Sequence, residues 1–396
     1  MPIQLKQLKT ELSAELDSIL KYWSKNTLDN KNGGFIGQID YNDHIIANTE
    51  KGAVLNARIL WSFSASYKVT KNESHKKIAK RAFEFLSEYF YDDEFGGLLW
   101  SINADKTLKD TKNQIYALAF AIYGLSEYYA ISKEDKALEI AINLYLKIQE
   151  HSYDPEHKGY FEALTRDWQP IDDLRLSDKD ANEKKTMNTH LHIVEAYANL
   201  YKVWKDKKLQ SDIIEILKTI EKHFINTETG HLRLFFNEKW IEKPDVISYG
   251  HDIEAAWLLL QCAQISEDET LIANYTKHAI QMAEVTKEGL DSDGGLWYEF
   301  NPEKNELVSE KHWWVQAEAL IGFYNAYQLT NDETYLNIVY KNWDFIKKYI
   351  LDKENGEWFW GINRDYSLIE KDKAGFWKCP YHNSRACLEL IERIKV

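Results

Sequence analysis

A histidine and a glutamate stand near the start of an otherwise apolar stretch of the chain, residues 248–260. His251, Glu254 and Trp257 follow one another at intervals of three residues, among alanine, isoleucine and leucine. Residues three apart lie on the same side of an α-helix, so the imidazole and the carboxylate would lie together. An imidazole titrates at about pH 6.5 and can accept or donate a proton near neutrality. The spacing therefore indicates acid–base chemistry at the beginning of a buried helix.

Five further stretches have the same character, with few charges, many small residues and polar side chains near their start. If all these helices run in the same direction, their polar first turns meet at one end of the molecule, and we expect them to share one cavity. His192 lies two residues after His190, about 200° further around a helix, and is expected to face the outer layer. The cavity candidates are Arg58, Tyr116, Asn188 with His190, Trp314 with Glu318, and His382 with Arg385.

A glycine-containing turn motif divides the chain into six repeats. Each copy has Asp, Asn or Glu close to a glycine, followed by aromatic and aliphatic residues that predict a short strand or hairpin. Copies recur at intervals of 61 to 71 residues, which indicates a repeat architecture. The marker glycines are Gly34, Gly97, Gly159, Gly230, Gly295 and Gly356.

Two kinds of helix alternate with these turns. A helix with one charged face precedes each turn, and a nearly uncharged helix follows it, which must be surrounded by other helices. We therefore predict an all-α fold, an (α/α)6 barrel of six inner and six outer helices with short β-hairpins at one rim. Residues 1–396 would form a single catalytic domain. The predicted outer helices are residues 3–24, 73–91, 133–151, 208–225, 268–287 and 332–350.

Composition narrows the class of partner. The formal net charge is −14, and the basic residues are dispersed among more numerous acids, which disfavours nucleic acid and anionic membranes. There is no apolar leader at the N-terminus and no long apolar run, and the three cysteines form no CxxC pair, so we expect a cytoplasmic protein. The expected partner is a small molecule bound by a monomer, and the 14 Trp and 24 Tyr suit stacking on sugar faces.

Acid–base catalysis explains the set of polar residues better than a metal does. HxxH and HxxxH pairs are absent from the sequence, and a nearby arginine would repel a cation, so no metal is expected. Two imidazoles on opposite sides of a bound carbon could remove a proton from one face and return one to the other. Glu254 would orient His251, and Arg58 would stabilise a transient oxyanion.

The segments that carry these residues resemble the N-acylglucosamine 2-epimerase superfamily, and most closely the cellobiose 2-epimerases. The resemblance extends over nearly the whole chain and implies an (α/α)6 barrel. It also implies an activity that needs no cofactor and interconverts glucose and mannose at the reducing end of β-1,4-linked disaccharides. Cellobiose would give glucosyl-mannose, and lactose would give epilactose. The segments are TEKGAVLNARILWSFS, NTHLHIVEAYANLY, SYGHDIEAAWLL, KHWWVQAEAL and GFWKCPYHNSRAC.

The resemblance also implies roles for individual residues. His251 and His382 resemble the acid/base pair acting at C2 through a cis-enediolate, and His190 the imidazole that assists ring opening. Arg58 resembles the arginine that stabilises the enediolate, and Glu254 the partner of His251. Trp314 and Trp377 resemble residues that line the sugar subsites; Tyr116, Asn188 and Glu318 resemble groups that hold sugar hydroxyls. Trp313 and Trp257 are either substrate-binding or core residues.

Three alternatives stay open at this point. A related enzyme of the same fold could be an aldose–ketose isomerase or a monosaccharide or N-acylglucosamine 2-epimerase. An inverting glycoside hydrolase could use Glu254 and Glu318 as paired carboxylates about 6.5–9.5 Å apart. A barrel without catalytic activity could bind sugars or proteins.

Overall fold

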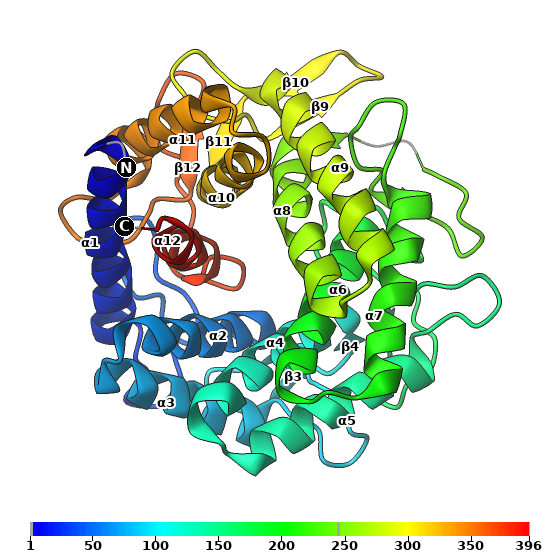
Figure 1. The fold of residues 1–396 in the computed structure, drawn as a ribbon. Helices are drawn as coiled ribbons and strands as arrows, with labels where there is room; N and C mark the ends of the chain where they lie inside the picture. Colours follow the sequence, from blue (N-terminus) through cyan, green and yellow to red (C-terminus); the bar gives the residue numbers. More distant parts are fainter. Residues whose placement is uncertain (1–2, 244–245, 396) are drawn as a thin grey trace.

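Two concentric rings of helices form the protein, and successive helices alternate between the outer and the inner ring (Figure 1). The computed structural model describes residues 3–243 and 246–395. The outer helices are α1 (Ile3–Asn26), α3 (Glu73–Tyr89), α5 (Asp135–His151), α7 (Lys207–Thr219), α9 (Glu269–Thr286) and α11 (Glu333–Phe345). The inner helices are α2 (Ala53–Thr70), α4 (Ile115–Ser132), α6 (Met187–Val203), α8 (Tyr249–Ser266), α10 (Trp313–Thr330) and α12 (Tyr381–Arg393).

The inner ring is closed. Each inner helix packs against the next one, and α12 packs back against α2. The predicted (α/α)6 barrel is therefore confirmed. Short π-helical turns extend α7 and α11 over Ile220–Phe224 and Ile346–Ile350, and a 3-10 turn over Lys287–Gly289 extends α9. These extensions bring the outer helices close to the ends that the sequence predicts.

The contrast between the rings follows from the side chains. The first fourteen residues of α4, Ile115–Tyr128, are all buried, because other helices surround it. Helix α3 buries only one face, through Ala79, Ala82, Phe83 and Leu86 among others, and exposes its charges. Among the described residues, no helix is long and apolar enough to cross a membrane.

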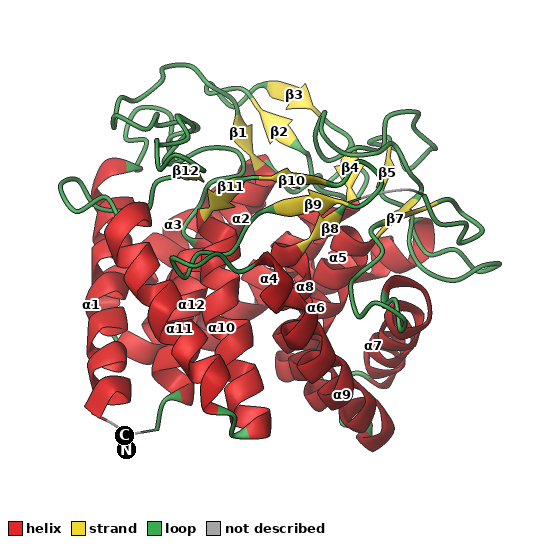
Figure 2. Cartoon of the chain, turned by 90° about the horizontal axis from the view of Figure 1, so that it is seen from above, coloured by secondary structure: helices red, strands yellow, loops and turns green. Residues whose placement is uncertain are grey.

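Short antiparallel strands lie together at one end of the helices, while α1 begins and α12 ends at the other end (Figure 2). They form the sheets β1-β2-β3, β4-β5, β6-β7, β8-β9-β10 and β11-β12. Strands β1, β4, β6, β8 and β11 each run directly into an inner helix, so these helices begin at the strand end. The strands are β1 (Lys51–Gly52), β2 (Ser101–Ile102), β3 (Leu108–Asp110), β4 (Asn113–Gln114), β5 (Ala163–Leu164), β6 (Lys185–Thr186), β7 (Phe235–Phe236), β8 (Ile247–Ser248), β9 (Glu299–Asn301), β10 (Glu306–Val308), β11 (Glu310–His312) and β12 (Gly361–Asn363).

The six predicted turns are present at this same end. Each closes on an isolated antiparallel bridge, such as Leu28 with Phe35 and Leu351 with Trp358. Gly34 has a φ of +61°, and a Cβ there would lie 2.5 Å from the Phe85 ring, so this turn requires glycine. In the second and fifth repeats the residue with positive φ is the preceding glycine, Gly96 or Gly294, and not the predicted marker.

Buried lysines tie three of these turns to the strand before the next inner helix. Lys51 on β1 donates to Asp29 at 2.7 Å, Lys185 on β6 to Asp154 at 2.8 Å, and Lys311 on β11 to Asp291 at 2.7 Å. We call these three pairs the turn locks. The aspartates also accept hydrogen bonds from backbone N–H groups of their own turns.

Candidate active site

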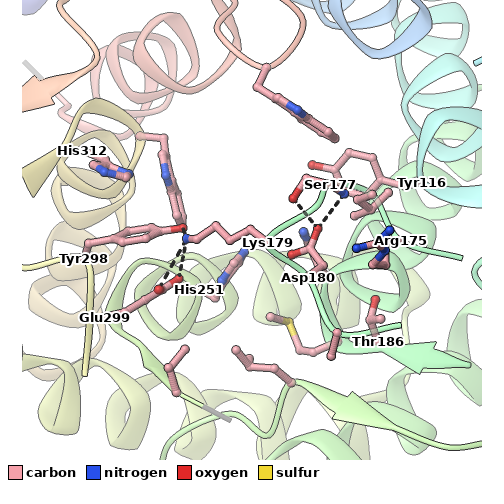
Figure 3. Close-up of a pocket in the computed structure, with 18 of the residues that line it drawn as sticks. Tyr116, Arg175, Ser177, Lys179, Asp180, Thr186, His251, Tyr298, Glu299 and His312 are labelled. Atoms are coloured by element: carbon pink, nitrogen blue, oxygen red, sulfur yellow. Dashed lines mark hydrogen bonds and ion pairs between the residues drawn. The ribbon is translucent and has the colours of Figure 1, made fainter. Parts of the chain in front are cut away.

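A cavity of about 620 Å³ lies at the strand end of the barrel, where the inner helices begin (Figure 3). Its size is typical of pockets that hold small molecules. All six inner helices or the residues just before them contribute to its lining. The predicted residues that line it are Arg58, Tyr116, Asn188, His251, Glu254, Trp313, Trp314, Trp377 and His382.

His251, in the first turn of α8, lines the cavity with a neutral ring. Its Nδ1 lies 2.8 Å from the Ser248 hydroxyl, and its ring centroid lies 5.0 Å from that of Trp314. Burial lowers the pKa of His251 to about 4, so the imidazole carries no charge at neutral pH. Glu254 does not hold this ring through a hydrogen bond as predicted, because its Oε1 accepts from Arg385 Nη2 at 2.5 Å.

His382, near the start of α12, lines the same cavity. Its Nδ1 donates to Glu318 Oε1 at 2.7 Å, and its ring centroid lies 5.7 Å from that of Trp314. Burial holds the pKa of His382 well below its usual value. Since a carboxylate only accepts, Nδ1 carries the proton and Nε2 is left as the basic nitrogen. Trp314 therefore contacts two neutral imidazoles, those of His251 and His382.

His190 does not reach the cavity, which corrects the sequence prediction. Its ring is fully buried, with Nδ1 2.7 Å from the carbonyl oxygen of Thr186 and Nε2 accepting the Tyr160 N–H at 2.9 Å. Both ring nitrogens are thus occupied by the backbone, and the ring packs against Trp240 at 5.7 Å. Burial lowers its pKa to about 3. His190 holds the turn of its repeat against α6.

His192, which we expected to face the outer layer, lines the cavity instead. Its Nδ1 donates to Glu195 Oε2 at 2.8 Å, and its ring meets that of Tyr116 edge-on at 5.1 Å. The prediction grouped Asn188 with His190, but residues two apart lie on different sides of a helix. Asn188 and His192 are four apart and share a face, so the spacing contained the signal that identifies His192.

Arg58 presents a buried cation to the cavity. Its Nη2 donates to the Tyr116 hydroxyl at 2.6 Å, and its guanidinium lies 4.1 Å from the centroid of Phe120. Its Nε has no hydrogen-bond partner, and Arg58 forms no ion pair with a carboxylate anywhere in residues 3–243 and 246–395. An unpaired guanidinium beside a cavity suits an anion or a developing negative charge.

Three carboxylates surround a second buried arginine beneath the cavity. Arg385 Nη1 donates to Glu195 Oε1 at 2.6 Å, and Nη2 donates to Glu254 Oε1 at 2.5 Å and to Glu318 Oε1 at 2.6 Å. We call Glu195, Glu254 and Glu318 the carboxylate cluster. Burial in this cluster raises the pKa of Glu318, whereas Arg385 helps to lower that of Glu195 to about 2.

Two residues predicted to bind substrate belong to this lower layer and do not line the cavity. Glu318 is fully buried and contacts His382 and Arg385. Trp257 is also buried and donates from Nε1 to Glu318 Oε2 at 3.0 Å. The sequence predicted both side chains to contact the sugar, but the structure places them behind the groups that line the cavity.

Glu254, Glu318 and His382 carry donor atoms of the kind that bind metal ions. Oxygens of Glu254 and Glu318 and a ring nitrogen of His382 lie within 4.8 Å of one another. The Arg385 guanidinium donates to both carboxylates, and His382 donates to one of them, so this cation and this N–H already occupy the oxygens that a metal would need. The chemistry of the set fits a positioned guanidinium better than a metal ion.

The cavity wall away from the helices contains residues that the sequence did not suggest. The connection from β5 to β6 supplies Ser177, Lys179 and Asp180, and Lys179 reaches across to Tyr298 and Glu299 (Figure 3). The Lys179 Nζ lies 4.1 Å from the centroid of Tyr298 and 3.4 Å from Glu299 Oε1. No helical or strand period marks this connection, so its residues could not be predicted from the sequence pattern.

The family model described as N-acylglucosamine 2-epimerase (GlcNAc 2-epimerase) matches residues 34–386. A cellobiose 2-epimerase from Bacteroides fragilis is 47% identical over 386 residues, covering 97% of this chain and 98% of the relative. The solved cellobiose 2-epimerase from Bacillus thermoamylovorans superposes with a TM-score of 0.93 at 38% identity, covering 98% of this chain and 100% of that structure. A D-mannose isomerase with a TM-score of 0.84 and 21% identity, covering 97% of this chain and 98% of its own, shares the fold.

Proposed function

The chain belongs to the N-acylglucosamine 2-epimerase family, and on that premise we propose that it is a cellobiose 2-epimerase. It interconverts glucose and mannose at the reducing end of β-1,4-linked disaccharides, converting cellobiose to glucosyl-mannose and lactose to epilactose. No cofactor takes part. Residues 1–396 act as a single catalytic domain, and the enzyme is a cytoplasmic monomer.

One observation carries this proposal: two neutral imidazoles, His251 and His382, line one cavity and both pack on Trp314. A neutral imidazole can take a proton at neutral pH, which a ring already protonated could not do. One imidazole removes the C2 proton of the open-chain aldose, and the electrons of the C–H bond form an enediolate with negative charge on O1. After rotation about the C2–C3 bond, the other imidazole takes a proton from solvent and delivers it to the opposite face of C2, and the first imidazole returns its own proton to solvent.

Arg58 and His192 serve the oxygen atoms in this proposal. The Arg58 guanidinium faces the cavity without a carboxylate partner, so its charge is free to stabilise the enediolate oxyanion. His192 donates from Nδ1 to Glu195 and keeps Nε2 for the substrate. We therefore assign to His192 the assistance in ring opening that the resemblance had suggested for His190.

The aromatic and amide groups hold the sugars. Trp314 and Trp377 line the cavity and stack on sugar faces. Trp377 lies 5.8 Å from Trp100, centroid to centroid, and 6.1 Å from Tyr116, which widens the apolar wall toward a second sugar. The Asn188 Oδ1 has no hydrogen-bond partner in the described residues and is available for a sugar hydroxyl.

The geometry does not favour an inverting hydrolase. Such enzymes hold their two carboxyl groups about 6.5–9.5 Å apart to admit a water molecule. Oxygens of Glu254 and Glu318 lie within 4.8 Å and share Arg385 Nη2, and Glu318 does not line the cavity. Glu318 is therefore in no position to protonate a glycosidic oxygen or activate a water.

Product analysis tests the proposal. The enzyme is incubated separately with cellobiose, lactose, mannose and N-acetylglucosamine, and the products are separated by chromatography. We expect a mannose-type reducing end from both disaccharides, with turnover far below this on the monosaccharides. Ketose as the first product, preference for a monosaccharide, or release of free glucose from cellobiose would each contradict it.

A further inference from the structure

Arg385 and Glu195 lie outside the cavity lining but contact the groups that hold its imidazoles. The guanidinium, from α12, bonds to carboxylates on three other inner helices: Glu195 on α6, Glu254 on α8 and Glu318 on α10. Each residue is nearly fully buried. Such a cluster is costly to desolvate, and apolar residues of similar volume would serve stability as well or better. A reason other than stability is therefore needed.

Two carboxylates of the cluster, Glu195 and Glu318, each orient one imidazole. Glu195 accepts from Nδ1 of His192 at 2.8 Å, and Glu318 accepts from Nδ1 of His382 at 2.7 Å. Both rings therefore have the same tautomer, with Nδ1 protonated and Nε2 facing the cavity. The third member, Glu254, itself lines the cavity. One planar guanidinium thus sets the positions of three groups that face the substrate.

We propose that Arg385 and Glu195 are positioning residues that couple His192 and His382, so that a change at Glu195 reaches His382 through the guanidinium. The kinetic part of this inference rests on the proposed epimerase function. The coupling itself does not, because it concerns only how the two rings are held. A rigid fork with Nη1 on one carboxylate and Nη2 on two others transmits displacement better than a flexible lysine would.

The cluster has further contacts that tighten the coupling. The Tyr381 hydroxyl donates to Glu195 Oε1 at 2.7 Å and is also in contact with Arg385 Nη1. Trp257 holds the free oxygen of Glu318. Each oxygen of Glu195 and Glu318 therefore has a partner, and a shift in one carboxylate must be accommodated by the guanidinium and by the others.

The test uses full-length protein with ¹⁵N-labelled histidine and compares Glu195→Gln with a matched control, Glu127→Gln. Glu127 is also a buried glutamate of an inner helix, but it is near the far end of α4 and pairs with Lys68. The Nδ1–H resonances of His192 and His382 are assigned with His192→Asn and His382→Asn. We expect Glu195→Gln to shift both resonances, although His192 is the only one of the two imidazoles that hydrogen-bonds to Glu195, and Glu127→Gln to shift neither. A shift confined to His192 would overturn the coupling.

Kinetics on cellobiose gives the second readout. Glu195→Gln should lower kcat about 10- to 100-fold, which is the usual effect of removing a residue that orients a functional histidine. Because Glu195 does not line the cavity, KM should stay within about threefold of the wild-type value. Arg385→Lys should lower kcat further than Glu195→Gln does. If Arg385→Lys does not fold, the kcat of Glu195→Gln alone tests the positioning role. A kcat equal to that of Glu127→Gln would contradict the positioning role. If Glu195→Gln shifts both resonances but the wild-type enzyme does not epimerise cellobiose, the coupling stands and only the proposed function is refuted.

Discussion

Two groups of buried charges in this barrel, the turn locks and the charges around the cavity, are arranged in opposite ways. In the turn locks, each buried lysine faces its own aspartate, and Lys311 has a second carboxylate from Asp293 at 2.6 Å. Around the cavity, Arg58 has no carboxylate partner in the described residues, whereas Arg385 has three. His192, His251 and His382 each have a hydrogen-bond partner at Nδ1 and none at Nε2 among the described residues.

The difference separates structure from function. A local pair of opposite charges that also has backbone hydrogen bonds offsets much of its own desolvation cost, and such a pair recurs in three of the turns. In the fourth repeat, Ile247 stands at the position of the lysine in the turn locks, and the neutral Asn226 stands at the position of the aspartate. The two charges are thus absent together, as expected for a local pair. The charges around Arg58 and Arg385 are not balanced in this way, which costs stability, and their arrangement is not repeated in the barrel. We explain it by a reaction in which negative charge develops on the substrate.

Removing either imidazole of the proposed pair should have the largest effect. His251→Asn or His382→Asn removes a positioned acid–base group, which typically contributes about 10²–10⁴-fold. We expect turnover of cellobiose to fall by at least about 10²-fold, with little change in the midpoint of thermal unfolding. Near-normal turnover in either variant would refute the two-base assignment.

Arg58→Met should abolish most activity without loss of stability. One oxyanion contact is worth about 10²–10³-fold in kcat. Because the guanidinium has no carboxylate partner to leave behind, unfolding in urea should occur at an unchanged or higher denaturant concentration. A large fall in that midpoint would show that Arg58 is structural.

Lys51→Met should do the reverse. It leaves Asp29 buried without its partner, and breaking a buried pair from one side costs about 3–5 kcal/mol of the free energy of unfolding. Turnover of the folded fraction should stay within about threefold, since Lys51 does not line the cavity. The comparison between regions fails if Lys51→Met and Arg58→Met affect stability and turnover in the same proportion.

His190 and His192 should differ although only one residue lies between them. His192→Asn should lower turnover about tenfold or more, as expected for a group that contacts the substrate. His190→Asn should keep turnover within about threefold and lower the free energy of unfolding by about 1–3 kcal/mol, because its two backbone hydrogen bonds are lost. Steady-state kinetics and urea unfolding of both variants measure this, and the reverse ranking would restore the original assignment.

The architecture could be predicted from the sequence because it depends on local and repeated signals. Apolar periodicity distinguishes α3 from α4, and the recurring glycine turns give the number of repeats. The position of the cavity followed from the direction of the inner helices. His251, His382 and Arg58 were therefore placed correctly at its lining.

The remaining features depend on tertiary contacts that no local pattern contains. The rotation of α6 about its own axis decides between His190 and His192, and it is fixed by packing against Trp240 and Tyr116. The carboxylate cluster joins residues as far apart as Glu195 and Arg385. The predicted bond between His251 and Glu254 failed for the same reason, since Arg385 comes from the far end of the chain.

The fate of the hydrogen at C2 tests the proposed two-base mechanism. Cellobiose is incubated with the enzyme in D₂O, and NMR observes the C2 position and the reducing-end anomeric signals together. Two imidazoles acting on opposite faces predict that each newly formed mannose-type reducing end carries deuterium at C2. Epimer that retains its original hydrogen at C2 would contradict proton transfer through two bases.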